Sequence, residues 1–209
     1  PIKGFAQSLP GVILICFLQN IFYFFGISGW VFTPVTRSIT QAAIAENAAM
    51  VAAGGTATNI YAYGFSRYHH IGGQLATLPL AFMMLFSKSK KYKLLGRATI
   101  IPSIFNINEP IIFGFPIMLN PLYVIPMVFS PAASGLVAWA LIGILPISFN
   151  PTISMPWVTP GFITVFFQGG VFMLLLWLIS LAIHFVMYLP FFLIDDNNAL
   201  KQEQELKAK

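Results

Sequence analysis

Charged residues are scarce in this chain of 209 residues: only 8% are Asp, Glu, Lys or Arg, whereas 57% are hydrophobic. A soluble domain carries charge on about a quarter of its residues, so a water-soluble enzyme is excluded. No charge falls between Lys3 and Arg37, and between Arg97 and Asp195 the single charged residue is Glu109. Uncharged apolar stretches of this length predict segments inside a lipid bilayer. The composition therefore indicates an integral membrane protein.

Cysteine is nearly absent as well, because Cys16 is the only one. A disulfide framework and a cysteine-based metal site are thereby excluded, and we expect neither a metal nor a cofactor. The apolar runs do not alternate with polar residues, which excludes barrel strands and favours helical spans. The net charge of +5 would suit nucleic acid in a soluble protein, but five of the eleven basic residues fall in one loop predicted at 88–97. Membrane topology explains that loop better, so no nucleic-acid partner is expected.

Four apolar segments are candidate membrane crossings. The first, Pro10 to Phe32, would be roughly 33 Å long as a helix, enough for a hydrocarbon core of about 30 Å. Two later runs at 122–147 and 171–194 are also long enough to span, and a fourth run at 71–86 ends in the basic loop. Basic loops lie on the cytoplasmic side, which orients the chain.

Two further segments, 34–68 and 98–120, carry too many polar residues, glycines and prolines for clean crossings. If the basic loop and the charged tail at 195–209 are both cytoplasmic, an even number of crossings separates them, and the runs at 122–147 and 171–194 supply two. The segment at 98–120 must then enter and leave from one face. We therefore predict an all-α membrane protein with polytopic transmembrane helices and two re-entrant helical hairpins. Residues 1–194 would form the membrane-embedded part and 195–209 a frayed cytoplasmic tail.

Glu109 is the strongest candidate for function. An ionisable residue inside a membrane is costly enough to be a functional candidate by default. It lies between Asn106, Asn108 and Pro110, and the proline lacks an N–H and disfavours helix at the residue before it, so the backbone opens where the polar side chains cluster. Amides and a carboxylate at a helix break suit sugar hydroxyls; alternatively they satisfy only the broken backbone. From the residues themselves, ligand binding is the favoured interpretation.

Residues 105–121, FNINEPIIFGFPIMLNP, resemble the signature of the membrane-embedded sugar permease, enzyme IIC, of the bacterial phosphotransferase system, in its lactose/cellobiose branch. The segments SKSK at 87–90, PWVTP at 156–160 and YLPF at 188–191 resemble the same family in the same order. The resemblance covers nearly the whole chain, but such permeases are about twice as long. It implies the C-terminal, substrate-binding half of a permease.

The resemblance implies a β-glycoside or disaccharide, such as cellobiose or lactose, that is carried inward while a phosphorylated IIB partner transfers phosphate to the sugar 6-hydroxyl. The phosphocysteine is on IIB, so whether this chain counts as an enzyme depends on that complex. It further implies a multi-pass protein of the bacterial cell membrane, homodimeric as the full-length permease. Glu109 matches the family glutamate beside that hydroxyl. The other matched residues are Asn106, Asn108 and Trp157, with Glu46 and Asn47 approaching from the other hairpin.

The sequence also departs from the family at the end of the first span. The family has Phe-Gly-Ile-His-Gly there, with a histidine near the 6-hydroxyl, whereas this chain has Ser28 in its place. Tyr23 stands where the family often has Trp, and the segment 72–77, GGQLAT, replaces the usual GGSGAT. A serine without a base beside it does not replace imidazole as a proton acceptor. Two alternatives stay open: a related transporter that binds sugar without phosphorylating it, and an inactive truncated remnant.

Other polar residues favour structural roles. His69 and His70 fall at the predicted outer membrane boundary, where a solvated or backbone-bonded role is favoured, and His184 would bond between packed helices. Arg67 is interpreted as an anchor at the membrane interface.

Overall fold

A computed structural model describes residues 2–62, 64–115, 117–145, 150, 153 and 155–208. Pro1, Pro116 and Ile147 belong to segments predicted above and lie outside these described residues. All regular secondary structure in the described part is helical, which confirms the predicted all-α class. The helices are α1 (Ile2–Gln7), α2 (Leu9–Phe24), the 3-10 helix η1 (Gly29–Phe32), α3 (Thr33–Ala52), α4 (Ser66–His69), α5 (Leu78–Leu85), α6 (Lys90–Ile104), α7 (Glu109–Gly114), α8 (Val124–Ile144) and α9 (Gly161–Lys207).

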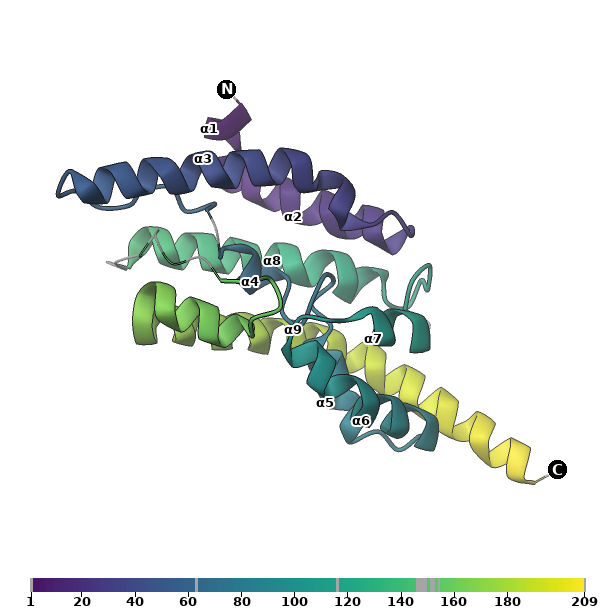
Figure 1. The fold of residues 1–209 in the computed structure, drawn as a ribbon. Coiled ribbons are helices and arrows are strands. Elements are labelled where there is room, and N and C mark those ends of the chain that lie inside the picture. Colours follow the sequence, from purple (N-terminus) through teal and green to yellow (C-terminus); the bar gives the residue numbers. More distant parts are fainter. Residues whose placement is uncertain are drawn as a thin grey trace.

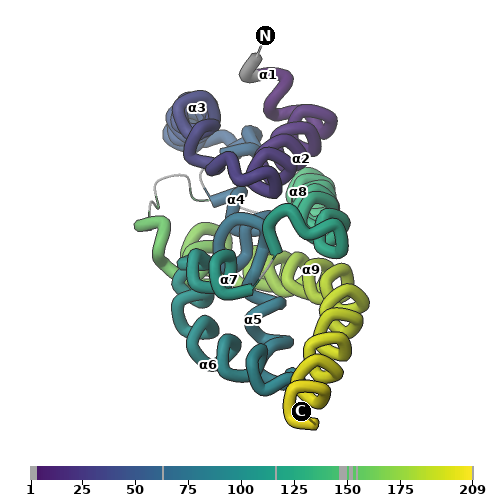
Figure 2. Tube along the Cα trace, turned by 90° about the vertical axis from the view of Figure 1, so that its right-hand side faces the viewer, coloured from purple at the N-terminus to yellow at the C-terminus, as the bar shows by residue number. Residues whose placement is uncertain are grey.

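The long helices are stacked in layers (Figure 1). Helix α2 packs on α8, and α8 packs on α9. Helices α5 and α6 pair with each other and lie beside the C-terminal part of α9, as both views show (Figures 1 and 2). Of the described helices, α8 and α9 are long and apolar enough to cross a membrane. Helix α9 bends at Gly169 and Gly170, whose dihedral angles are not helical. Its long apolar part therefore begins at residue 171, where the span 171–194 was predicted to begin.

The predicted first span is interrupted. Helix α2 ends at Phe24, and Gly26 follows with φ +86°. The N–H groups of Gly26 and Ile27 donate to the carbonyls of Tyr23 and Phe22, which closes the last helical turn and satisfies two free carbonyls. A residue without a side chain at position 26 allows this turn at no steric cost. The prediction of one helix from Pro10 to Phe32 is therefore wrong, and the last residues form η1 instead.

The apolar segment at 71–86 is also only partly helical. Gly72, Gly73, Leu75 and Ala76 have positive φ angles, and α5 begins only at Leu78. Leu75 and Ala76 are fully buried. The backbone N–H of Leu75 donates to Asn20 Oδ1 at 3.2 Å. Tertiary contacts thus hold a turn in the left-handed backbone conformation, which residues other than glycine rarely adopt.

The basic segment is a helix and not a loop from Lys90 onward, which corrects the prediction. Ser89 Oγ accepts from the N–H of Tyr92 and begins α6. The predicted frayed tail is also wrong, because α9 remains helical to Lys207. Carboxylates of α9 accept hydrogen bonds from the start of α6, so the basic segment and the tail lie on the same side of any membrane the protein spans. This shared side is the condition from which an even number of crossings between the two segments was predicted.

The two segments predicted as hairpins differ in structure. The first contains one unbroken helix, α3, followed by a turn and a non-helical return. Asn47 fixes this return, because its amide bonds both the N–H and the carbonyl of Asn59 at 2.9 Å. The second consists of α6 and α7 with a break at 105–108. Entry of either segment into the bilayer from one face stays a prediction.

Candidate functional site

The break between α6 and α7 is built around Asn106, whose φ is +64°. Asparagine is one of the few residues other than glycine that occupies this region readily. The N–H groups of Asn106 and Ile107 donate to Ser103 and Pro102 carbonyls, which ends α6. Glu109 and Pro110 then begin α7, where the missing proline N–H is not needed. The sequence therefore opens the backbone where the candidate residues stand.

Asn106 anchors the loop that carries Trp157. Its Nδ2 donates to the carbonyls of Trp157 and Thr159, each at 2.9 Å. Arg67 holds the same loop from the other direction, because its guanidinium donates to the Trp157 carbonyl at 2.7 Å and to the Pro156 carbonyl at 3.1 Å. Both side chains are only 8% exposed. Arg67 is thus a buried loop anchor, and its interpretation as an interfacial anchor is wrong.

Asn108 is connected to the segment at 72–77. Its Nδ2 donates to the backbone carbonyl of Gln74 at 2.5 Å, and it packs so tightly on Gly73 that a Cβ there would lie 2.6 Å from its Cγ. The Gln74 side chain in turn covers Gly29, where a Cβ would collide with its amide, and donates to the Gln19 carbonyl at 3.1 Å. Gln74 therefore joins the Ser28 segment to the Asn108 segment.

Glu109 differs from these amides because its side chain is exposed. In the described part of the chain its carboxylate accepts no hydrogen bond, while it lies near enough to Tyr23 to act on the phenol electrostatically. Ser28 is exposed too, and its Oγ accepts from the Trp30 N–H at 3.3 Å as the cap of η1. The Glu109 carboxylate and the Ser28 hydroxyl are thus accessible to a ligand.

The structure brings most of the predicted residues together. Asn106 links to Trp157, Asn108 links to Gln74, and Gln74 packs beside Ser28. We call these seven residues the site cluster: Ser28, Trp30, Gln74, Asn106, Asn108, Glu109 and Trp157. Tyr23 lies next to it.

Glu46 and Asn47 have partners elsewhere. Asn47 is fully buried and bonds the Asn59 backbone, and Glu46 Oε2 accepts from Asn59 Nδ2 at 3.1 Å. They lie on α3, which runs through the upper layer of Figure 1, whereas α7 lies below it. These hydrogen bonds connect the pair to Asn59 and not to the site cluster.

Sequence reasoning missed Gln74, Trp30 and the loop-anchoring role of Arg67. In the sequence Gln74 is only a departure from the family pattern. The signal that could have identified it is a bulky amide beside two glycines. No local signal existed for Arg67, because its carbonyl acceptors are about ninety residues away in sequence.

Two of the histidines, His69 and His184, lie in the protein interior. His184 is fully buried, with Nδ1 2.9 Å from Ser130 Oγ and Nε2 3.1 Å from the Tyr68 carbonyl, which confirms its expected role between packed helices. His69 is 1% exposed, so its predicted solvation is wrong. Its Nδ1 has no hydrogen-bond partner among the described residues, and the backbone-bonded role stays a prediction.

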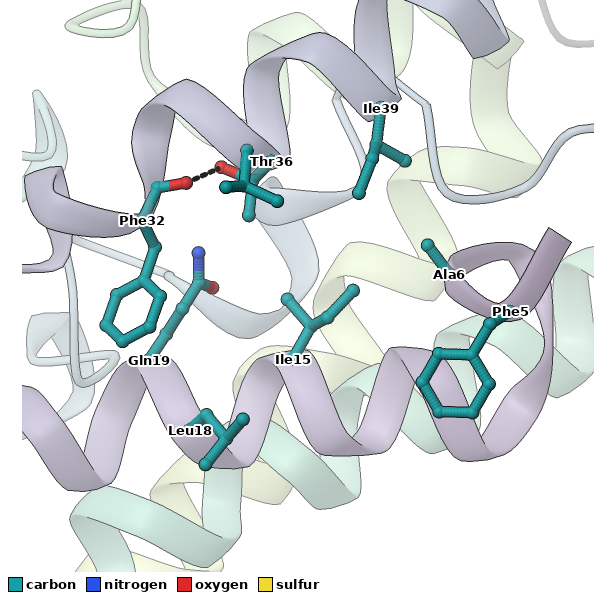
Figure 3. A pocket seen from close by; sticks show the side chains of 9 residues that line it. Phe5, Ala6, Ile15, Leu18, Gln19, Phe32, Thr36 and Ile39 are labelled. Carbon is teal, nitrogen blue, oxygen red and sulfur yellow. Dashed lines mark hydrogen bonds between the residues drawn. The ribbon is translucent and has the colours of Figure 1, made fainter. Parts of the chain in front are cut away.

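A cavity of about 190 Å³ lies between α2 and α3 (Figure 3). It is lined by Phe5, Ala6, Ile15, Leu18, Gln19, Phe32, Val35, Thr36 and Ile39. Polar sugar hydroxyls buried against such an apolar wall would lose their hydrogen bonds. The lining of this cavity therefore does not suit a polar ligand such as a sugar.

Comparison with solved structures defines the class of the fold. The chain superimposes on a crystal structure of the transporter ChbC, the IIC component from the N,N'-diacetylchitobiose-specific phosphotransferase system, with a TM-score of 0.90 and 30% identity. The match covers 98% of this chain and 48% of that one. The architecture is that of a phosphotransferase-system IIC transporter.

Sequence comparison agrees. The family model described as phosphotransferase system, EIIC, matches residues 4–131. The chain is 38% identical to the galactose-specific EIIC component of Lactococcus lactis subsp. cremoris (strain MG1363), over 98% of this chain and 46% of that protein. It is 32% identical to the lactose-specific EIICB component of Staphylococcus aureus (strain N315), over 99% of this chain and 37% of that protein. The chain thus belongs to the EIIC family of the phosphotransferase system, and it spans less than half the length of these relatives.

Proposed function

We propose that this chain is the sugar-binding part of a phosphotransferase-system permease in a bacterial cell membrane. It takes up a β-glycoside or a disaccharide such as lactose or cellobiose. Phosphorylated IIB phosphorylates the 6-hydroxyl of the bound sugar. The membrane-embedded part is 1–194, the tail at 195–209 faces the cytoplasm, and the complete permease is a multi-pass homodimer.

One observation carries this proposal: Glu109 presents an exposed carboxylate that accepts no hydrogen bond from the described residues, at a break whose amides are already fixed. Asn108 bonds Gln74, and Asn106 bonds the Trp157 loop, so both hold the frame of the site. A charged acceptor on a fixed frame binds a hydroxyl without first ordering its surroundings. The indole of Trp157, 51% exposed, offers a flat apolar surface to the C–H face of a sugar.

The relatives support the substrate class and the partner. Those named above are specific, by their names, for galactose, lactose and N,N'-diacetylchitobiose. These sugars share a pyranose ring with a 6-hydroxyl. The staphylococcal relative is an EIICB component, which combines C and B parts in one protein. A IIB partner for this chain follows by analogy.

Two measurements on the purified protein in lipid nanodiscs test the proposal. Calorimetric titration with lactose and with cellobiose measures binding. Transfer of labelled phosphate from phosphorylated IIB then measures formation of the sugar 6-phosphate. A 6-deoxy analogue is the matched control, because it retains the ring but lacks the acceptor hydroxyl. Binding without a difference in transfer between the sugar and its 6-deoxy analogue would contradict the proposed chemistry.

A second candidate function is sugar binding with slow or absent phosphorylation, and a specific observation favours it. Ser28 stands where the resemblance places a histidine, and Gln74 fills the space at Gly29 next to it. No hydrogen bond joins an imidazole to Ser28 among the described residues, and His69 and His184 are buried in the interior. Sugar that binds but acquires no phosphate would support this candidate.

A further inference from the structure

We propose that Trp30 is a second sugar-binding aromatic residue of the site cluster and forms, with Trp157, a corner of two indoles against which one pyranose ring packs. This rests on the proposed function. No pattern in the sequence marks Trp30 as a binding residue, and the pairing is visible only in the fold.

The geometry of the two rings suits a sugar. Their centroids lie 6.4 Å apart, with an interplanar angle of 87°. Perpendicular rings present the face of one indole and the edge of the other at the same place. The C–H face of a pyranose packs on an aromatic face, and the electropositive ring edge lies near its hydroxyl oxygens. A lone indole offers one wall, whereas a perpendicular pair contacts the sugar ring from two sides.

The corner is exposed although its backbone is held. Trp30 is 66% exposed and Trp157 51% exposed. The Trp157 backbone is fixed by Arg67 and Asn106. The Trp30 N–H donates to Ser28 Oγ, and Gln74 covers Gly29 just before it. Fixed backbones with exposed large apolar side chains are typical of binding surfaces.

The position of the corner connects it to Glu109. Trp30 follows Ser28 by two residues, and the Trp157 loop is bonded by Asn106, three residues before Glu109. A disaccharide with one ring at the corner can therefore place a hydroxyl toward the carboxylate.

The other role for an exposed tryptophan in a membrane protein is an anchor at the lipid interface. The two roles give different results in one experiment. Lactose and cellobiose are titrated calorimetrically into nanodiscs that contain the wild type, Trp30→Ala, Trp30→Phe, Trp157→Ala or the double alanine variant. Phe172→Ala is the matched control, since Phe172 is 65% exposed on α9 and thus equals Trp30 in exposure.

We expect Trp30→Ala to weaken glycoside binding at least tenfold and Trp30→Phe to weaken it less, because phenyl retains an aromatic face. The double variant should lose less affinity than the two single losses together, since the rings act as a pair. Phe172→Ala should bind as the wild type does. Unchanged affinity in Trp30→Ala, with altered partition into the nanodisc lipid, would overturn the inference and leave the proposed function intact. A wild type that binds neither sugar would overturn both.

Discussion

Two regions of this molecule hold carboxylates under opposite conditions. At the site cluster, Glu109 is exposed and its carboxylate has no hydrogen bond within the described residues. Where the end of α9 meets the start of α6, Asp195, Asp196 and Glu203 form what we call the acidic clamp. Asp196 is 3% exposed and accepts from Ser87 Oγ and from the N–H groups of Lys88 and Ser89.

The other members of the acidic clamp are bonded too. Glu203 accepts from Ser89 Oγ at 2.6 Å and from the N–H groups of Lys90 and Lys91 at 3.1 Å. Asp195 accepts from the hydroxyls of Tyr92 and Tyr123 at 3.3 Å. The first N–H groups of a helix have no partner within the helix, and anions near them are favourable. Acids with satisfied oxygens stabilise the fold, whereas an acid left open on a rigid frame is available to a ligand.

The largest expected effect separates the two regions by stability. Asp196→Ala removes a buried acceptor and leaves the Ser87 hydroxyl and the N–H groups of Lys88 and Ser89 without this partner, so we expect a loss of about 3 kcal/mol in the free energy of unfolding. Chemical unfolding of the purified protein in detergent measures it. Glu205→Ala is the control, since Glu205 lies exposed on the same helix. Equal stability of Asp196→Ala and wild type would remove the distinction between the two regions.

The next effect concerns phosphoryl transfer at the site cluster. A hydroxyl that attacks phosphocysteine must lose a proton, and a positioned base typically contributes 10²- to 10⁴-fold. We expect Ser28→His to raise the single-turnover rate about 10²-fold, which corresponds to about 2.7 kcal/mol, without a comparable gain in affinity. Transfer from phosphorylated IIB at saturating sugar is the measurement. Fast and equal rates in both proteins would show that Glu109, or water it holds, is the base.

A third effect tests the open carboxylate. Glu109→Gln should weaken glycoside binding by at least about 1.5 kcal/mol, the lower range for a hydrogen bond to a charged group. Its unfolding free energy should stay within about 0.5 kcal/mol of the wild type, as for other exposed substitutions. Calorimetry and chemical unfolding measure the two quantities. Lost stability with unchanged affinity would assign Glu109 to the same class as the acidic clamp.

The smallest expected effect is a pH dependence of stability. It concerns Glu203 of the acidic clamp, which lies beyond the span predicted at 171–194. The hydrogen bond from Ser89 Oγ, followed by those from the Lys91 and Lys90 N–H groups, lowers the pKa of Glu203 to about 2. A carboxyl with a lower pKa in the folded state stabilises that state fully above its unfolded pKa of about 4.3. This contribution is lost as the pH falls toward 2.

The thermal midpoint of Glu203→Gln should therefore lie below that of the wild type at pH 6, and the difference should shrink by pH 3. Glu205→Gln, with no such bonds to the start of α6, should match the wild type at both pH values. A difference for Glu203→Gln that is the same at both pH values would contradict the role of its charge.

Several features of the fold followed from local sequence. The charge-free runs predicted helical spans, and α8 and α9 agree because a bilayer requires long apolar helices with all backbone groups paired. Pro110 predicted a break near Glu109, and one is present at 105–108. Glu109 itself is helical and begins α7, contrary to the expectation that proline keeps the residue before it out of a helix. The histidine at 184 was predicted as a packing residue because a polar group in an apolar helix needs a partner on a neighbouring helix.

Other predictions failed where contacts distant in sequence overrode local pattern. The tail at 195–209 resembles a frayed end by composition, yet α9 stays helical because Asp196 and Glu203 pair with the start of α6 more than a hundred residues earlier. Gly26 ended the first span early, although the run around it is apolar. The turn at Leu75 and Ala76 exists only because Asn20 and the core hold it.

The sequence alone determined the membrane class, the family resemblance and the position of Glu109 at a break, because these depend on composition and on neighbouring residues. The tertiary structure decided which side chains share the site. It placed Gln74 between Ser28 and Asn108, brought the Trp157 loop to Asn106 and Arg67, and set Trp30 perpendicular to Trp157. It also separated the open carboxylate of Glu109 from the bonded carboxylates of the acidic clamp. Hydrogen-bond partners that lie 34 to 114 residues apart in sequence are fixed by helix packing, which local pattern does not encode.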